Sequence, residues 1–430
     1  MGASNSPDTV GLDMLETKQL PVLLGMCVIM VTTAFAQSEE DETADYYDSG
    51  EATRVEAQFS SFMQPGIQLP AESNASRSTR NQNLSFSSRN RLARAPNMFG
   101  DPISVNVSEV PNVPGFVLEN PLTIRSAVPL AAGRAVPISE NNKPIPMDRV
   151  YYNYHGFQNA VQFSRQLVPG GPLVTTETNL NRHTFGFEKT FLDGRWSIDT
   201  RTPFTDGYQA TAPGFATDSG RFGNISMYLK HLAYQDDSLA LAYGLGVSLP
   251  TGSDIETLVN GSRFTIENDA VHLLPFVGFY ALPNDDWFYQ GFATVDVATN
   301  SNEVTLGPPN RTVGRLTEQN EFRADLSVGR WLYQNEEATY DRGLAGVVEL
   351  HYTTQIQDPD NFTFDTTGTG FSSGRFENLA GHTDVLNLTM GLHWQITEMS
   401  SFRVGAVAPL KSAPDRQFDS EIQASFNRNF

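Results

Sequence analysis

From residue 149 to its last residue, the chain alternates apolar side chains with small or polar ones. In the segment "SLALAYGLGVSLPTG", leucine, tyrosine and valine occupy one face, while alanine, glycine and serine occupy the other. The segment "VLNLTMGLHWQI" repeats this alternation. A period of two is typical of a β-strand with one apolar face, because successive side chains of a strand point to opposite sides. The pattern therefore predicts strands rather than helices.

Twelve segments follow this pattern, and short and long connections alternate between them. The predicted strands are residues 149–156, 181–192, 195–203, 224–234, 238–252, 270–282, 287–298, 321–333, 344–354, 385–396, 401–410 and 418–430. Short turns such as "DG" and "PNDD" alternate with long polar stretches such as residues 299–320 and 355–383. Outer-membrane barrels have short turns on one side and long loops on the other. We therefore predict an all-β fold, a transmembrane antiparallel β-barrel of about 12 strands over residues 149–430, with an irregular N-terminal extension.

The C-terminal segment "EIQASFNRNF" ends on an aromatic residue in the middle of a predicted strand. In a closed barrel the last strand pairs with the first, so its apolar face meets lipid and Phe430 joins the aromatic girdle. This ending resembles the signature by which outer-membrane proteins are recognised for insertion, which implies the barrel-assembly machinery and outer-membrane lipid as partners. Arg428 departs from the pattern, although near the membrane rim its side chain can reach water. The alternative is an amphipathic edge strand of a soluble domain.

The N-terminal segment predicts export from the cytoplasm. The apolar run "LPVLLGMCVIMV" follows Lys18 and is followed by the small-residue pattern Ala34-Phe35-Ala36. This order is that of a secretory signal peptide, with cleavage after Ala36. We expect residues 1–36 to be removed and the mature chain to reach the cell outer membrane. A retained membrane anchor is the alternative, although the run is short for a membrane-spanning helix.

Residues 37–148 form a predicted extension without apolar periodicity. Residues 37–60 are acidic, residues 73–94 carry five arginines, and residues 96–147 are rich in proline, valine and asparagine. The prolines exclude long helices and central strands. The extension is therefore either a disordered periplasmic segment or a plug inside the barrel. The two blocks of opposite charge either pair or remain solvated.

Composition narrows the classes of function. The formal net charge is -20, which argues against nucleic acid as a partner, because phosphate binding needs a basic surface. Cys27 is the only cysteine, and it lies in the segment that we expect to be removed. The mature chain would then have no disulfide framework and no cysteine metal site. The sequence shows no phosphate-binding loop and no zinc-ligand spacing, so we expect no cofactor and no metal.

Several charged and polar residues fall on the predicted inner face of the barrel. They are Arg195, Asp199, Arg201, Arg323, Asp325, Glu349, His351, Asn387 and His393. Mixed charges in a barrel lumen either line a water path or fill the interior by pairing with one another. Inner-face glycines such as Gly244, Gly246 and Gly391 leave room and favour a channel.

These features favour passive passage of small solutes through an outer-membrane barrel. The alternative is a non-conducting barrel that anchors a surface or periplasmic partner. An outer-membrane hydrolase would need a serine and a histidine within hydrogen-bond reach on the lipid-facing side. His351 and His393 fall on the predicted inner face without such a serine, so we expect no enzymatic activity.

The segment "YGLGVSLPTGSD" resembles the strand and "LPTG" turn of an outer-membrane transporter family named for the meta-pathway of phenol degradation. The segments "HTFGFEKTFLDGRWSIDTRTPF" and "ENNKPIPMDRVYYNYHGFQNA" are similar to those of outer-membrane proteins from planctomycete bacteria. The resemblance covers roughly residues 138–430. It implies a barrel that passes small, hydrophobic molecules, and it assigns no catalytic residue.

Overall fold

The computed structural model describes residues 95–101, 114–120, 122–127, 135–166, 173–206, 209–212, 215–218, 222–259, 262–307, 310–357, 362–364, 373–378, 382, 384–412 and 415–430. All of them belong to one compact unit, Asn81–Phe430. The predicted signal peptide and the two charged blocks lie outside the described residues. Among the described residues, no helix is long and apolar enough to cross a membrane.

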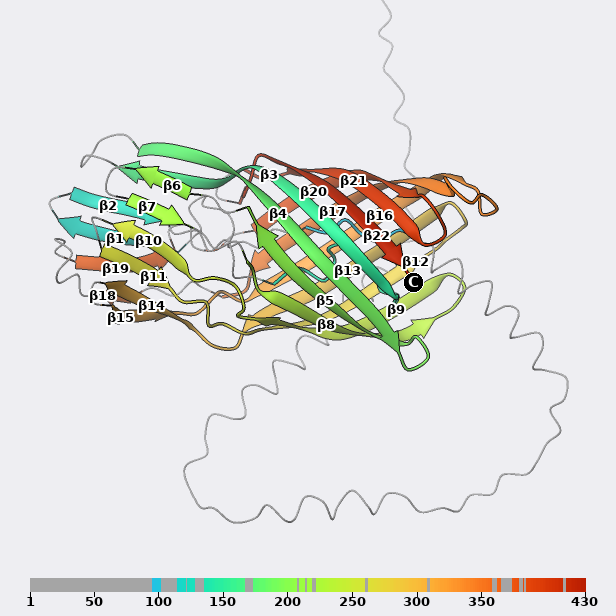
Figure 1. Ribbon diagram of the computed structural model, residues 1–430, viewed down its shortest axis with the longest axis horizontal. Helices are drawn as coiled ribbons and strands as arrows, with labels where there is room; N and C mark the ends of the chain where they lie inside the picture. The colour runs from blue at the N-terminus through green and yellow to red at the C-terminus, as the bar shows by residue number, and fades with distance from the viewer. Residues whose placement is uncertain are drawn as a thin grey trace, which may run out of the picture. The chain divides into compact units, whose positions relative to one another are not determined.

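Twelve antiparallel strands close into a barrel, in the order β12-β13-β16-β17-β20-β21-β22-β3-β4-β5-β8-β9 (Figure 1). The strands are β3 (Arg149–Gln166), β4 (Leu173–Phe191), β5 (Trp196–Thr205), β8 (Ile225–Gln235), β9 (Leu239–Leu249), β12 (His272–Ala281), β13 (Trp287–Ala298), β16 (Glu321–Gln334), β17 (Gly343–Gln355), β20 (Asp384–Gln395), β21 (Ser400–Pro409) and β22 (Ser420–Asn429). The last strand pairs with the first, with Phe426 opposite Tyr152. The prediction of an all-β antiparallel barrel of about 12 strands is therefore confirmed.

The two ends of the barrel differ in their connections. At one end, here called the turn end, short turns join β4 to β5, β8 to β9, β12 to β13, β16 to β17 and β20 to β21. Both Arg149, where β3 begins, and Phe430 lie at this end, and Phe430 N donates to Asp148 O at 3.2 Å. The opposite end, here called the loop end, carries the long connections.

The connections at the loop end contain more strands than the sequence predicted. A six-stranded sheet has the order β15-β14-β11-β10-β7-β6, and a four-stranded sheet has the order β18-β19-β1-β2. The bounds are β1 (Pro114–Asn120), β2 (Leu122–Ala127), β6 (Gln209–Ala212), β7 (Phe215–Asp218), β10 (Ile255–Val259), β11 (Ser262–Ile266), β14 (Asn302–Gly307), β15 (Arg311–Leu316), β18 (Phe362–Phe364) and β19 (Ser373–Asn378). Short strands with polar residues at many positions give a weak alternation signal, which explains why the pattern missed them.

The two sheets also change the picture of the first hairpin and of the N-terminal extension. β3 and β4 run well beyond the predicted 149–156 and 181–192, with an irregularity between Phe157 and Val161 where the register shifts. β1 and β2, which belong to the extension, form a hairpin in which β1 pairs with β19 (Figure 1). Part of the extension therefore reaches the loop end of the barrel.

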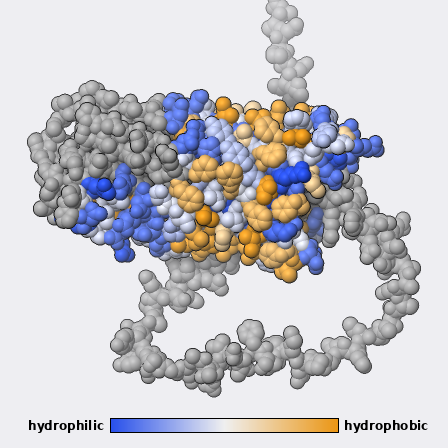
Figure 2. Space-filling view, in the orientation of Figure 1, coloured by the Kyte–Doolittle hydropathy of each residue, from blue (hydrophilic) through white to orange (hydrophobic). Residues whose placement is uncertain are grey.

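The two faces of the barrel wall have different side chains. Large apolar side chains point outward and are exposed, including Phe185, Ile198, Leu229, Tyr243, Leu326, Leu350, Met390, Val404 and Ile422. Figure 2 shows hydrophobic side chains gathered over the barrel wall, with hydrophilic ones towards the loop end. Inward-facing positions are mostly buried and polar, which is the alternation that the sequence predicted.

Candidate functional site: the barrel lumen and its plug

Two tracts of the extension, residues 95–101 and 135–147, fill the interior of the barrel and are here called the plug. Almost all of their residues are buried. The tracts pair with each other, because Met98 N donates to Asn142 O at 2.7 Å and Asn141 N donates to Phe99 O at 3.2 Å. Their hydrogen-bond partners on the wall come from β3, β4, β5, β8, β13, β17, β20, β21 and β22. The lumen is therefore occupied from several sides of the wall.

The plug runs along the barrel and back. Ala95 lies in an apolar cluster with Ala240 and Phe288, which flank turns at the turn end, and Asp101 accepts from Asn387 near the loop end. On the return, Val136 N donates to Ser226 Oγ near the loop end at 3.2 Å, and Met147 N donates to Glu188 near the turn end. Between these two passes the chain forms β1 and β2.

Four cations of the wall donate to carbonyl oxygens of the plug backbone. Arg403 donates to Asn97 O at 2.8 Å and also to Met98 O. Arg201 donates to Pro137 O and to Ile138 O. The other two are Arg149, which donates to Asn141 O, and Lys230, whose Nζ lies 2.9 Å from Lys143 O. These bonds place positive charge against the plug without using its side chains.

Neutral groups extend this pattern. Gln290 donates to Pro96 O, Gln423 donates to Gly100 O, and the Tyr228 hydroxyl donates to Val136 O. In the other direction, the Glu349 carboxylate accepts from Phe99 N at 3.0 Å and from Gly100 N at 2.9 Å. The wall thus offers the plug mainly hydrogen-bond donors.

Phe99 anchors the first tract in a niche of the wall. A Cβ added to Gly391 would lie 2.4 Å from the Phe99 ring, and one added to Gly405 would lie 3.0 Å from it. The Arg403 guanidinium lies 4.9 Å from the centre of the same ring. The interpretation of inner-face glycines as free space is therefore wrong for Gly391, because the room is filled by the plug. Gly244 and Gly246 are likewise occupied, by Phe276 and Tyr228 of the wall.

Glu140 and Lys143, which lie in the plug and outside the barrel strands, are charged groups in buried positions. Burial by itself raises the pKa of the Glu140 carboxyl, but Arg182 and His155 outweigh it and hold that pKa well below its usual range. The contacts fit, since Arg182 donates to Glu140 at 2.9 Å. Burial lowers the pKa of the Lys143 ammonium to about 7, and nearby Arg149 and Lys230 lower it further.

A second polar cluster, here called the loop-end cluster, consists of wall and loop residues only: His272, Asp296, Glu318, Glu321 and Arg323. His272 lies between two carboxylates, 2.7 Å from Asp296 and 3.5 Å from Glu318. Arg323 pairs with Glu321 at 2.8 Å and with Asp296 at 3.3 Å. Buried charges are stabilised only when they are paired, and the charged members of this cluster pair with one another.

Eight of the nine predicted lumen residues are buried inside the barrel: Asp199, Arg201, Arg323, Asp325, Glu349, His351, Asn387 and His393. Asp325, His351 and Glu349 lie together, with His351 2.7 Å from Asp325 and 3.4 Å from Glu349. Arg195 differs: it lies in the turn between β4 and β5 and is exposed. The strand begins one residue later, at Trp196, because residues 192–195 form the turn.

Sequence reasoning missed several of the wall residues that contact the plug. Arg149, Glu188, Lys230 and Arg403 are buried, and each alternates along its strand with outward-facing neighbours. That alternation was the available signal, because a charge at an inward position of a barrel strand has to face the interior. No group of three or more His, Cys, Asp or Glu in the described part of the chain is arranged to hold a metal ion.

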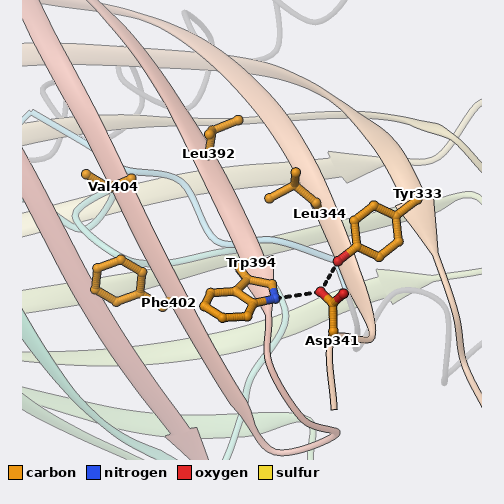
Figure 3. Close-up of a pocket in the computed structure, with 7 residues that line it drawn as sticks. All are labelled: Tyr333, Asp341, Leu344, Leu392, Trp394, Phe402 and Val404. Carbon is orange, nitrogen blue, oxygen red and sulfur yellow. Dashed lines mark hydrogen bonds between the residues drawn. The ribbon is translucent and has the colours of Figure 1, made fainter. Parts of the chain in front are cut away.

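The outer wall has a small apolar groove near the turn end, of about 290 Å³. It is lined by Tyr333, Asp341, Leu344, Leu392, Trp394, Phe402 and Val404 (Figure 3). Trp394 Nε1 donates to Asp341 at 2.9 Å, and the Tyr333 hydroxyl donates to the same carboxylate. Aromatic residues with one polar atom are typical of the interface between lipid and water.

No protein-family model matches the chain, and no curated protein matches it. The phenol meta-pathway family and a planctomycete origin therefore stay predictions. Among solved structures, the chain is similar to an outer-membrane channel from Pseudomonas putida F1, with 11% identity, a TM-score of 0.42, and coverage of 67% of this chain and 97% of the other.

The chain is also similar to the β domain of a Bordetella autotransporter, with 12% identity, a TM-score of 0.41, and coverage of 66% of this chain and all of the other. A third similar structure is a mutant of the monoaromatic hydrocarbon channel TodX, with 10% identity, a TM-score of 0.37, and coverage of 67% and 93%. Because each TM-score lies below 0.5, the function proposed below is inferred from this chain's own residues.

Proposed function

We propose that this chain is an exported outer-membrane β-barrel that passes small solutes through its lumen when the plug is displaced. In this proposal residues 1–36 are a cleaved signal peptide, and the strand ending at Phe430 is recognised by the barrel-assembly machinery. The barrel acts as a passive channel and not as an enzyme. The outward belt of exposed apolar side chains supports a membrane location, because soluble proteins rarely expose such large apolar surfaces.

One observation carries the channel proposal: the lumen is filled by a tract that is separable from the wall. The barrel strands pair with one another around the complete circle. Within the described residues, the plug tracts contain no strand. Side chains of the wall bind the backbone of the plug, so the plug does not pair with the barrel strands. Displacement of the plug would therefore leave the backbone hydrogen bonds of the barrel intact.

The experiment is planar-bilayer conductance of the folded, full-length chain at increasing urea concentrations. We expect no conductance steps without urea, because the lumen is filled. We expect discrete, reversible steps at urea concentrations that loosen the plug before the barrel unfolds. The gel mobility of unheated protein at each urea concentration serves as the control for an intact barrel.

Absence of steps at every concentration that leaves the barrel folded would contradict the channel proposal. It would favour the non-conducting anchor, for which the filled lumen is the motivating observation. The resemblance to the phenol meta-pathway family implies hydrophobic solutes, whereas the groups around the plug suit solutes that carry hydrogen-bonding oxygens.

A further inference from the structure

We propose that the opened lumen selects small anions that carry several acceptor oxygens, such as carboxylates, although the chain as a whole is strongly acidic. This inference rests on the proposed function, because it concerns the wall after the plug has moved. It follows from the chemistry of the groups that the plug now covers, and from which of them keep a partner without it.

The plug backbone shows which kind of atom the wall accommodates. Among the described residues, seven wall side chains donate to its carbonyl oxygens: Arg149, Arg201, Tyr228, Lys230, Gln290, Arg403 and Gln423. In the same part of the chain, three wall side chains accept from its N–H groups: Glu188, Ser226 and Glu349. A solute that replaces the plug therefore meets an excess of donors, and acceptor oxygens satisfy them. A hydrophobic solute would leave these buried donors unpaired, which is costly.

The wall cations that remain after the plug has left differ in whether they keep a carboxylate partner on the wall. Arg201 keeps Asp199 at 2.8 Å, while Arg149 and Lys230 both keep Glu188 at 2.9 Å. These two wall carboxylates are thus held by wall cations whether or not the plug is present. Their negative charge is not free to attract cations from solution. The Glu349 carboxylate loses Phe99 N and Gly100 N when the plug leaves, but it keeps His351 of the wall at 3.4 Å.

Arg403 is the exception among the four cations. Within the part of the chain that the structure describes, its guanidinium donates to Asn97 O, Met98 O and Ser425 Oγ and forms no ion pair. Its Nε is buried without a hydrogen-bond partner. When the plug leaves, Arg403 loses both carbonyls and becomes a positive charge that faces the opened lumen. Guanidinium groups bind carboxylate oxygens in two-pronged geometry, which suits this position.

The net charge of -20 would suggest the opposite selectivity. Charge outside the lumen has little effect on a permeating ion, because salt screens it beyond about 10 Å at 0.1 M. The carboxylates of the loop-end cluster are paired with His272 and Arg323. The sign of selectivity is therefore set where the lumen carries an uncompensated group.

The experiment measures the reversal potential of the urea-opened, full-length channel in a KCl gradient. We expect chloride to be more permeant than potassium, and added succinate to reduce the chloride current. Arg403→Gln should lower the ratio of chloride to potassium permeability about tenfold, because one charge ~6 Å away in water changes the permeability of each ion about threefold and in opposite directions. Arg403→Lys should keep most of the ratio, since it keeps the charge.

The matched control is Arg330→Gln, which removes an exposed arginine on the outside of the same wall and should leave the ratio unchanged. A conducting pore that prefers potassium would overturn this inference, and so would a chloride-to-potassium ratio that Arg403→Gln does not change. Either result would leave the proposed channel function standing. Complete silence from a folded barrel would overturn the proposed function, and the inference with it.

Discussion

The plug and the loop-end cluster fill the barrel interior by different means. The plug is a separate tract of chain, held by wall side chains that bind its backbone and by one aromatic side chain, Phe99. The loop-end cluster is formed by the wall and its loops, whose charges pair with one another. We therefore expect closure of the lumen and stability of the barrel to depend on different residues. Changes in the plug should open the lumen, whereas changes in the cluster should weaken the barrel.

Phe99→Ala should have the largest effect on the plug. Truncation of a buried aromatic side chain costs about 3–5 kcal/mol, and the niche at Gly391 would be left empty. We expect conductance steps without urea and a nearly unchanged unfolding temperature of the barrel. Phe402→Ala, on the outward face, is the matched control and should stay closed. A silent Phe99→Ala channel would contradict the role of this side chain as the anchor.

Asp296→Asn should have the opposite effect, which is to lower the stability of the barrel without opening the lumen. It removes the charge that holds His272 and Arg323, and breaking a buried ion pair costs about 3 kcal/mol or more. We expect a lower temperature for conversion from the folded to the unfolded gel band, without conductance in the absence of urea. If this variant opened the channel while the barrel stayed folded, the division between plug and cluster would be wrong.

Glu349→Gln should weaken the plug less than Phe99→Ala does. The amide keeps one acceptor oxygen, but it loses the charge, and its NH2 group replaces the oxygen that accepts one of the two bonds from Phe99 N and Gly100 N. We expect a loss of about 2 kcal/mol in plug binding, since charged hydrogen bonds contribute roughly twice as much as neutral ones. The measurement is the urea concentration at which steps first appear, which should fall below that of the unmodified chain.

The smallest effect should be a pH dependence of closure that comes from Lys143. Its pKa is about 7 in the plugged state and 10.5 in water, so the open state binds more protons between these values. Lowering the pH through this window therefore favours opening, by at most about 1.4 kcal/mol per pH unit. Below pH 7 the dependence on this group should vanish.

Bilayer recordings at pH 9 and pH 8 check this sign, with more opening expected at pH 8. The charged groups that face Lys143 are Arg149, Lys230 and Glu188. Lys143→Met should remove the dependence, because it keeps the length of the side chain without the proton. A dependence that survives this substitution would assign the proton to another group.

The strands of the barrel could be predicted from the sequence because their inward and outward positions face different surroundings along their full length. The lumen was predicted in part: Asp199, Glu349 and His351 could be assigned to the interior from alternation alone. The partners of these residues could not, because they lie on a tract without periodicity and far away in the chain. The contact between Phe99 and Glu349 joins residues 250 positions apart. An inward-facing glycine is ambiguous for a similar reason. Gly391 leaves space in the lumen, but the amino-acid sequence does not show that Phe99 fills that space.

The hairpin of β1 and β2 limits how the barrel can be assembled. It lies between the two plug tracts in the chain and pairs with β19, Phe116 being opposite Phe376. The hairpin is held at the loop end by its pairing with β19, and the two plug tracts that flank it in the chain lie inside the lumen. We expect the N-terminal tract to be in place before β22 joins β3, since threading it through a closed ring would be slow. A force that pulls the plug towards the turn end would then have to break the pairing of β1 with β19 before the two plug tracts could leave the lumen.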